Sequence, residues 1–226
     1  MKMLVDYHTH ILPELDDGAK DLKTSLEMLE ILKNQGVKQI IATPHFYAHR
    51  EKSVEHFLEK RQRAFEKINS NSPLPILLGA EIAIEHNISE IKDIEKLAIQ
   101  GTKLILLELP YRKHKDWMSE EIYNISAEYG LKVILAHIHR YLEYYSKEQI
   151  QQILSTDAVF QINNEAFASL RERRFVKALI KQERSLVLGS DCHNIADRKP
   201  NWNLLKRRSK SSAMELSNGI LDKYKL

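Results

Sequence analysis

The chain has 226 residues, of which 43% are hydrophobic and 29% charged, a balance typical of a globular protein and not of a disordered one. Its net charge of +3 is too small to indicate nucleic-acid binding on charge alone. The single cysteine, Cys192, excludes an internal disulfide framework and a cysteine-based zinc site.

The first ten residues, MKMLVDYHTH, contain no apolar stretch of the signal-peptide type. No run of about 18 uncharged apolar residues follows anywhere in the chain, so we expect no membrane insertion. Together with the reduced cysteine, these features favour a cytoplasmic location.

Seven short apolar runs rich in Val, Ile and Leu are typical of buried parallel strands. In chain order they cover 4–10, 37–45, 75–84, 103–111, 132–138, 158–164 and 185–191. Helix-like stretches separate them at 21–35, 51–69, 87–99, 116–129, 146–155 and 165–183. This alternation predicts a parallel sheet with helices outside it.

A closed barrel and an open doubly wound sheet are both compatible with that order. The open sheet is expected to carry a glycine-rich turn after its first strand. Here that turn reads HTHILPELDDG, and the whole chain has only seven glycines. We therefore predict a seven-strand α/β barrel that forms a single domain over 1–226.

Metal-ligand residue types stand at the ends of six of the seven predicted strands. The strand-end residues are His8 with His10, His45, Glu81, Glu108, His137, Asn163, and Asp191 with His193. Because the carboxyl ends of the strands of a βα barrel meet at one rim, we expect these side chains to form one cluster.

Two of the strand ends carry a pair of ligand types, H-x-H and D-x-H, and alternation places each pair on one face of its strand. Asp17 is a further candidate ligand, although a turn before Gly18 explains it too, and Asp16 fits that turn equally well. A mixed imidazole and carboxylate set favours Mn, Fe or Zn in a reactive site. Nine ligands fit two or three ions, and such a site favours phosphoester hydrolysis.

Arg140 and Arg198 follow two of the predicted ligand strands closely. A guanidinium fork matches phosphate oxygens in a bidentate way, so both are candidates for phosphate binding. The alternative is a solvated loop arginine.

The motifs HTH, TPH, GAE, AHI-x-R and SDCHN resemble those of the PHP (polymerase and histidinol phosphatase) superfamily. In order, and from residue 4 to about residue 202, they resemble the bacterial capsular-polysaccharide-type, manganese-dependent protein-tyrosine phosphatases. This resemblance implies a distorted (β/α)₇ TIM-like barrel of the PHP fold. It also implies a three-metal site for Mn²⁺, with Fe or Zn as alternatives.

The resemblance further implies a division of the candidate ligands among three ions. His8, His10, Glu81 and Asp191 would hold the first, Glu81, Glu108 and His137 the second, and Asp17, His45 and His193 the third. Arg140 and Arg198 would hold the phosphate, and a metal-bound hydroxide would attack it. The implied substrate is phosphotyrosine on a bacterial tyrosine autokinase that controls capsular or exopolysaccharide synthesis.

The chain also departs from that branch. His139 stands where the branch commonly has Glu, and it either supports the site or is a solvated loop residue. The segment 203–226 is shorter than expected, which leaves the packing of the last helix open. The clusters RERR (171–174) and KRR (206–208) either dock an acidic partner or are solvated helix charges, and we favour the latter.

Three alternatives remain beside the phosphotyrosine reading. One is a phosphatase for a small metabolite such as histidinol phosphate, and another is a catalytically idle metal-binding module. The third uses Cys192 as nucleophile, because Arg198 follows it at the spacing of cysteine-dependent phosphatases. The intervening residues contain no glycine to cradle phosphate, and alternation turns Cys192 away from Asp191 and His193, so we disfavour that route.

Overall fold

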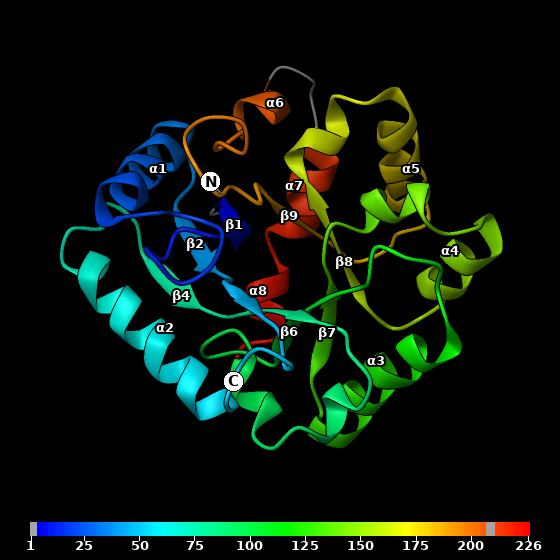
Figure 1. The fold of residues 1–226 in the computed structure, drawn as a ribbon. Helices are drawn as coiled ribbons and strands as arrows, with labels where there is room; N and C mark the ends of the chain where they lie inside the picture. The colour runs from blue at the N-terminus through cyan, green and yellow to red at the C-terminus, as the bar shows by residue number, and fades with distance from the viewer. Residues whose placement is uncertain (1–3, 207–210) are drawn as a thin grey trace.

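The computed structural model describes residues 4–206 and 211–226, and within them short parallel strands form the interior while helices lie outside (Figure 1). The strands are β1 (Val5–Thr9), β2 (Gln39–Ala42), β3 (His45–Phe46), β4 (Ile76–Leu78), β5 (Glu81–Ala83), β6 (Leu104–Glu108), β7 (Lys132–Leu135), β8 (Val159–Asn163) and β9 (Leu186–Gly189). Every pair of neighbouring strands is parallel, so the predicted α/β architecture is confirmed.

Helices connect and cover these strands. They are α1 (Leu22–Asn34), α2 (Val54–Asn69), α3 (Asp116–Tyr129), α4 (Lys147–Leu154), α5 (Leu170–Lys181), α6 (Asn203–Lys206), α7 (Ser211–Ser217) and α8 (Ile220–Lys223). Short 3₁₀ helices are η1 (Ile88–Glu90), η2 (Ile94–Leu97), η3 (Ile138–Glu143) and η4 (Asn164–Phe167). None of the helices in the described residues is long and apolar enough to cross a membrane.

The strands form two sheets, with the orders β1-β2-β4 and β3-β5-β6-β7-β8-β9. Two of the predicted strands are each divided into two short strands. Thr43–Pro44 separates β2 from β3, and Gly79–Ala80 separates β4 from β5. Proline has no N–H for a sheet ladder, which explains the break at Pro44. The pairing resumes at once, since the Glu81 N–H donates to the Pro44 carbonyl at 3.0 Å.

Backbone contacts join the two sheets where β1 meets the end of β9. Thr9 and Cys192 form a parallel bridge, and the His10 N–H donates to the Cys192 carbonyl at 3.0 Å. In the opposite direction the Asp191 N–H donates to the His8 carbonyl at 2.8 Å. These bonds link the first predicted strand to the last, as the barrel prediction requires.

The prediction of a helix over 87–99 is wrong. The segment contains only η1 and η2, and each begins after a residue in the left-handed region, Asn87 with φ 62° and Asp93 with φ 66°. A residue with positive φ cannot continue an α-helix. The regularly spaced apolar side chains of this segment therefore belong to two short 3₁₀ helices instead. Ile88, Ile94 and Leu97 are all buried.

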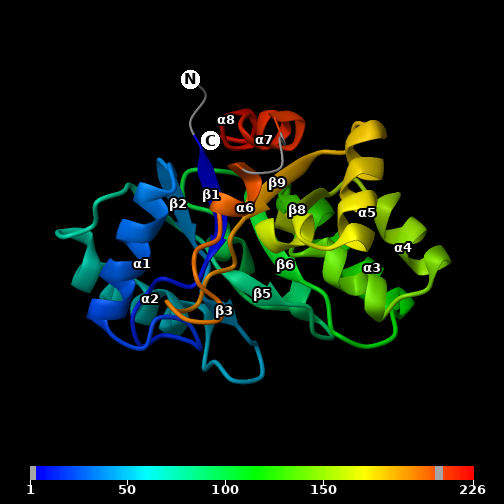
Figure 2. The same ribbon diagram turned by 90° about the horizontal axis from the view of Figure 1, so that it is seen from above.

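The C-terminal segment packs across the end of the strands where they begin. Figure 2 shows α7 and α8 together at that end, opposite β3. The Tyr7 hydroxyl donates to the Ser217 carbonyl at 3.2 Å and accepts from the Leu221 N–H at 2.9 Å. Ile220 completes an apolar cluster with inward residues of the strands, among them Val5 and Leu106. The C-terminal segment therefore covers this end of the sheet.

Gly189 is a point of close approach between β9 and β1, and it provides a test of this packing. A Cβ at Gly189 would lie 2.7 Å from the His8 Cβ and 2.8 Å from Gln161 Nε2. We expect Gly189→Ala to lower the free energy of unfolding by about 1–3 kcal/mol, the usual cost of overpacking. Denaturant unfolding measures it.

The matched control is Gly219→Ala, because a Cβ there would meet no atom within 4 Å. Equal stability of the two variants would contradict the close contact of β1 with β9.

Candidate metal centre

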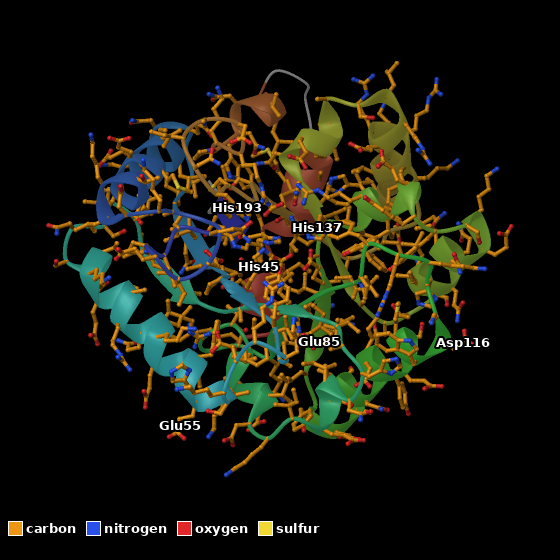
Figure 3. All side chains as sticks on the ribbon, viewed as in Figure 1. His45, Glu55, Glu85, Asp116, His137 and His193 are labelled. Atoms are coloured by element: carbon orange, nitrogen blue, oxygen red, sulfur yellow. The ribbon has the colours of Figure 1, made fainter. Side chains whose placement is uncertain are left out.

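The candidate ligands gather at the carboxyl ends of the strands. In Figure 3 the labelled His45, His137 and His193 lie near the middle of the ribbon, whereas Glu55 and Asp116 lie toward its edge. His8 and His10 come from the end of β1, and Glu108 ends β6. His45 and Glu81 begin the short strands β3 and β5, while the remaining predicted ligands lie in the loops after β1, β7 and β9. The structure therefore brings together side chains that are up to 185 positions apart, from His8 to His193.

His8 and His10 point at the same carboxylate. Their Nε2 atoms lie 3.1 Å apart, and Glu81 Oε2 lies 3.0 Å from His8 Nε2 and 3.2 Å from His10 Nε2. Asp191 Oδ1 is 3.6 and 3.5 Å from the same two nitrogens. His8, His10 and Asp191 thus form a buried group with ligand atoms close enough to share one ion.

Glu81 also faces a second group of side chains. Its Oε1 lies 2.9 Å from His137 Nε2, which is 3.4 Å from Glu108 Oε1. Its Oε2 lies 3.2 Å from His45 Nδ1, and His45, Glu81 and Glu108 form a second group of possible ligands. Glu81 is therefore in position to bridge two ions.

Asp17 completes a third group at the more open side of the centre. Its Oδ1 lies 3.4 Å from His45 Nε2 and 3.4 Å from His193 Nε2. His10 belongs to this group as well as to the first one. The three groups overlap, and the division of ligands among separate ions stays a prediction.

Charge at the centre keeps its buried acids ionised. Burial alone would raise the pKa of Glu81, but the imidazoles of His8, His10 and His137 hold that pKa well below its usual range. Burial likewise opposes ionisation of Asp191, and His8 together with Arg140 lowers its pKa. The centre thus holds carboxylates in the form that binds cations.

The His137 imidazole responds in the opposite direction to its carboxylate contacts. Burial alone would lower the pKa of His137, but hydrogen bonds to Glu108 and Glu81 raise it to about 9. In the described part of the chain, His45 Nδ1 and His193 Nε2 are buried without a hydrogen-bond partner. Buried ring nitrogens that point at carboxylates without a hydrogen bond fit direct ligation of a cation.

Two of the candidate ligands have unusual backbone geometry. His137 has φ 28° and Asp191 has φ 51°, values that side-chain-bearing residues seldom adopt. The residues around them hold these conformations, since the Asp191 N–H donates to the His8 carbonyl at 2.8 Å and the His137 N–H donates to Gln161 Oε1 at 2.6 Å. Such strain is frequent at functional sites, where it aims a side chain.

Two side chains on β8 support the ligands, and the sequence interpretation missed their role. Gln161 Oε1 lies 3.2 Å from His8 Nδ1, and Gln161 Nε2 donates to Asn163 Oδ1 at 2.8 Å. Asn163 Nδ2 in turn donates to Asp191 Oδ2 at 3.0 Å. The signal for both was present in the run FQINN, where polar side chains alternate with apolar ones.

Asp16 is a positioning residue as well as a turn residue. Its Oδ2 lies 2.7 Å from His10 Nδ1 and accepts from the His45 N–H at 3.0 Å, while its Oδ1 accepts from the Gly18 N–H at 2.9 Å. Asp17, the adjacent carboxylate, belongs to the third group instead. Residue type and spacing alone do not distinguish the two neighbouring acids.

Both predicted arginines line the centre. Arg140 NH1 lies 2.9 Å from Asp191 Oδ2, and its NH2 lies 2.6 Å from Glu165 Oε1. Arg198 NH2 lies 3.1 Å from Asp191 Oδ1. They share a pocket of about 390 Å³ lined by His45, Tyr47, Glu81, Glu108, Tyr111, His137, Arg140, Asp191 and Arg198.

His139 is not the solvated loop residue that one interpretation allowed. It is buried on η3, where Glu165 Oε1 lies 3.9 Å from His139 Nε2. Burial lowers the pKa of His139 to about 4, so the ring is neutral near pH 7. Of the two basic clusters, RERR lies on α5, whereas residues 207–208 of KRR fall outside the described residues.

The Cys192 side chain does not line the pocket, although Asp191 and His193 flank it in the sequence. It is fully buried and packs in the main hydrophobic cluster. Burial, with the nearby charge of Asp6, raises the pKa of its thiol well above the usual value. A thiol in this position stays protonated, which argues against a nucleophilic role.

The chain matches a known protein family and several characterised relatives in sequence. Residues 4–215 match the family described as Capsular polysaccharide synthesis, CpsB/CapC. The chain is 28% identical over 206 residues to the tyrosine-protein phosphatase YwqE of Bacillus subtilis, covering 86% of this chain and 79% of that protein. It is 26% identical over 216 residues to the tyrosine-protein phosphatase CpsB of Streptococcus pneumoniae, covering 87% and 86%.

Solved structures show the same relationship. The fold matches a crystal structure reported for YwqE from Bacillus subtilis and CpsB from Streptococcus pneumoniae, described as metal-dependent tyrosine phosphatases. The TM-score is 0.75 and the identity 25%, with 99% of this chain and 96% of that chain covered. The phosphotriesterase of Mycobacterium tuberculosis shares the fold, with a TM-score of 0.57 and 11% identity over 95% and 91% of the chains.

The contacts of Asp16 predict that it orients ligands without being one. We expect Asp16→Asn to weaken divalent-cation binding about 10–100-fold, as is usual when a partner of a ligating histidine is lost. Calorimetric titration of the chelator-treated protein with Mn²⁺ measures this. Asp21→Asn is the matched control, because Asp21 caps α1 through Thr24 and Asn preserves that cap. Equal affinities in the two variants would exclude the positioning role.

Proposed function

The chain belongs to the CpsB/CapC family of capsular polysaccharide synthesis, and we propose that it is a metal-dependent protein-tyrosine phosphatase. The observation that carries this proposal is the position of Glu81. Its two carboxylate oxygens face imidazoles on different sides, and two arginines line the same pocket. Cation ligands and phosphate-binding groups thus meet at one opening.

We assign the candidate ligands as the family resemblance implies. His8, His10, Glu81 and Asp191 would hold one ion, Glu81, Glu108 and His137 a second, and Asp17, His45 and His193 a third, with Mn²⁺ as the proposed metal. Such ions supply Lewis acidity that activates water and offsets the charge of phosphate oxygens. The oxygen and nitrogen donors of this set suit Mn²⁺, Fe or Zn.

Arg140 and Arg198 would bind the phosphate group. Both guanidinium groups lie against Asp191, whose carboxylate is also a candidate ligand. If Asp191 held a cation, its carboxylate would attract the two guanidinium groups less strongly, and these groups would be available for phosphate oxygens. Glu165 holds Arg140 from the other side, through Nε at 3.2 Å and NH2 at 2.6 Å, so this side chain stays aimed at the pocket.

The lining of the pocket favours phosphotyrosine over a small aminated phosphate. Its carboxylates, Glu81, Glu108 and Asp191, all belong to the candidate ligand groups. Among the described residues that line it, no further carboxylate is left to bind the ammonium group of a ligand such as histidinol phosphate.

The complete donor set also argues against an idle module. The proposed partner is a cytoplasmic bacterial tyrosine autokinase.

Metal removal tests the proposal directly. We expect chelator-stripped protein to lose hydrolysis of a phosphotyrosyl peptide and to regain it when Mn²⁺ is added. Cys192→Ala should behave like the parent protein, because its thiol is buried and protonated. Phosphate release measures both, and activity that survives stripping but is lost in Cys192→Ala would establish the cysteine route instead.

Glu81→Gln tests the bridging carboxylate. Loss of this charge, which contacts four imidazoles, should abolish turnover and reduce the number of bound ions, measured by elemental analysis after desalting. Glu85→Gln is the control, because Glu85 contacts His49 and belongs to none of the three groups. Full metal content in Glu81→Gln would refute the bridging role.

Arg198→Ala separates phosphate binding from metal binding. We expect the KM for a phosphotyrosyl peptide to rise about 10–100-fold, the loss of a hydrogen bond to a charged group. Metal content should stay unchanged, since Arg198 offers no ligand atom. Loss of metal in this variant would mean that Arg198 supports the ligands instead.

A further inference from the structure

Tyr111 is an aromatic wall of the pocket that the proposed mechanism does not use. It follows β6 closely, three residues after the candidate ligand Glu108, and 42% of its surface stays exposed. It lines the same pocket as Arg140 and Arg198. A large aromatic side chain with this exposure beside a phosphate site offers surface to a ligand.

Packing fixes the position of the Tyr111 ring. The ring stacks against His137, with centroids 5.7 Å apart and an angle of 21°, and against Tyr141 at 5.5 Å and 28°. Tyr144 meets it edge-on at 5.4 Å. Because its neighbours hold the ring on several sides, a ligand that contacts it pays little ordering entropy.

Hydrogen bonds also fix the backbone that carries Tyr111. The Tyr141 hydroxyl donates to the Leu109 carbonyl at 2.8 Å, and the Tyr145 hydroxyl donates to the Pro110 carbonyl at 2.9 Å. These two bonds tie the residues between β6 and Tyr111 to η3 and the turn after it. The wall is therefore part of the rigid frame of the pocket.

Tyr47 lies on the other side of the centre, and its ring is less available for contact with a ligand. Its ring stacks on His45 at 5.1 Å, and the guanidinium of Arg50 lies 4.6 Å from its centroid. Since His45 contacts one oxygen of Glu81 and His137 the other, Tyr47 and Tyr111 stand on different sides of that carboxylate. Among the described residues no cation lies over the Tyr111 ring, so Tyr111 is the wall that can receive a second ring.

We propose that Tyr111 binds the aromatic ring of the substrate and makes the pocket selective for aryl phosphates over alkyl phosphates. The inference rests on the proposed function and identifies the residue that recognises its substrate class. With the phosphate between the ligand groups and Arg140, the ring of phosphotyrosine reaches Tyr111 in an offset or edge-on contact. A phosphoserine side chain has no group to make that contact.

Two phosphonates that cannot be hydrolysed test the inference without turnover. Benzylphosphonate carries the ring and methylphosphonate does not, so the ratio of their dissociation constants reports on the wall alone. We expect Mn²⁺-loaded protein to bind benzylphosphonate more tightly in calorimetric titration. Tyr111→Leu should reduce that preference about tenfold, which corresponds to about 1.4 kcal/mol. Tyr111→Phe should keep it.

Tyr123→Leu is the matched control, because Tyr123 lies on α3, is 71% exposed and does not line this pocket. An equal loss of both phosphonates in Tyr111→Leu would overturn the inference, since the variant would then disturb the phosphate site itself. An equal loss of preference in Tyr111→Phe and Tyr111→Leu would also overturn it, because the hydroxyl would be responsible.

A separate measurement distinguishes failure of the underlying function. If the Mn²⁺-loaded protein binds benzylphosphonate with the expected preference but hydrolyses no phosphotyrosyl peptide, the phosphatase proposal fails while the ring-binding wall stands. If the protein hydrolyses the peptide and the preference is the same in Tyr111→Leu as in the parent, the wall fails and the phosphatase proposal stands.

Discussion

The structure depends on the burial of several ionised groups at one end of a parallel sheet. Glu81 and Asp191 are almost fully buried, and so are His8 and His10, which face them. Isolated charges in such a position would be strongly destabilising, so the site is stable only when each charge has a partner. In the described residues the imidazoles and Arg140 supply that partner. Divalent cations would supply it more completely, because a ligand carboxylate then faces two positive charges.

The opposite end of the sheet is apolar and carries no candidate ligands among the described residues. There the inward side chains are apolar, and the C-terminal segment covers them through Ile220 and the two hydrogen bonds of Tyr7. Parallel barrels commonly separate a stabilising end from a reactive end in this way. Because the apolar packing that stabilises the strands lies at this end, the ligand end tolerates strained backbone and polar side chains. Gly189 ends β9 on the ligand side, where its lack of a side chain lets the strand approach His8.

Much of this arrangement could be predicted from the sequence, because strand periodicity is a local property and the alternation of strands and helices along the chain can be read directly. Once the apolar runs were placed in a parallel sheet, their last residues had to meet at one rim. The breaks in two strands and the left-handed conformations of Asn87 and Asp93 could not be predicted, since they depend on neighbouring strands and on loop packing. The role of Asp16 was equally hidden, because two adjacent acids differ only in which neighbours the fold brings to them.

The role of His139 could not be predicted from the sequence either, because spacing does not show whether a side chain is buried. Alternation from His137 predicted only a direction, but η3 buries the ring against Glu165, which in turn holds Arg140. Arg140 therefore lies between Glu165, which keeps it in place, and Asp191, which competes with phosphate for it. On the proposed function, a cation bound by Asp191 weakens that competition and leaves Glu165 as the lasting partner. Metal and phosphate would then bind cooperatively, because both act on the charge of one buried carboxylate.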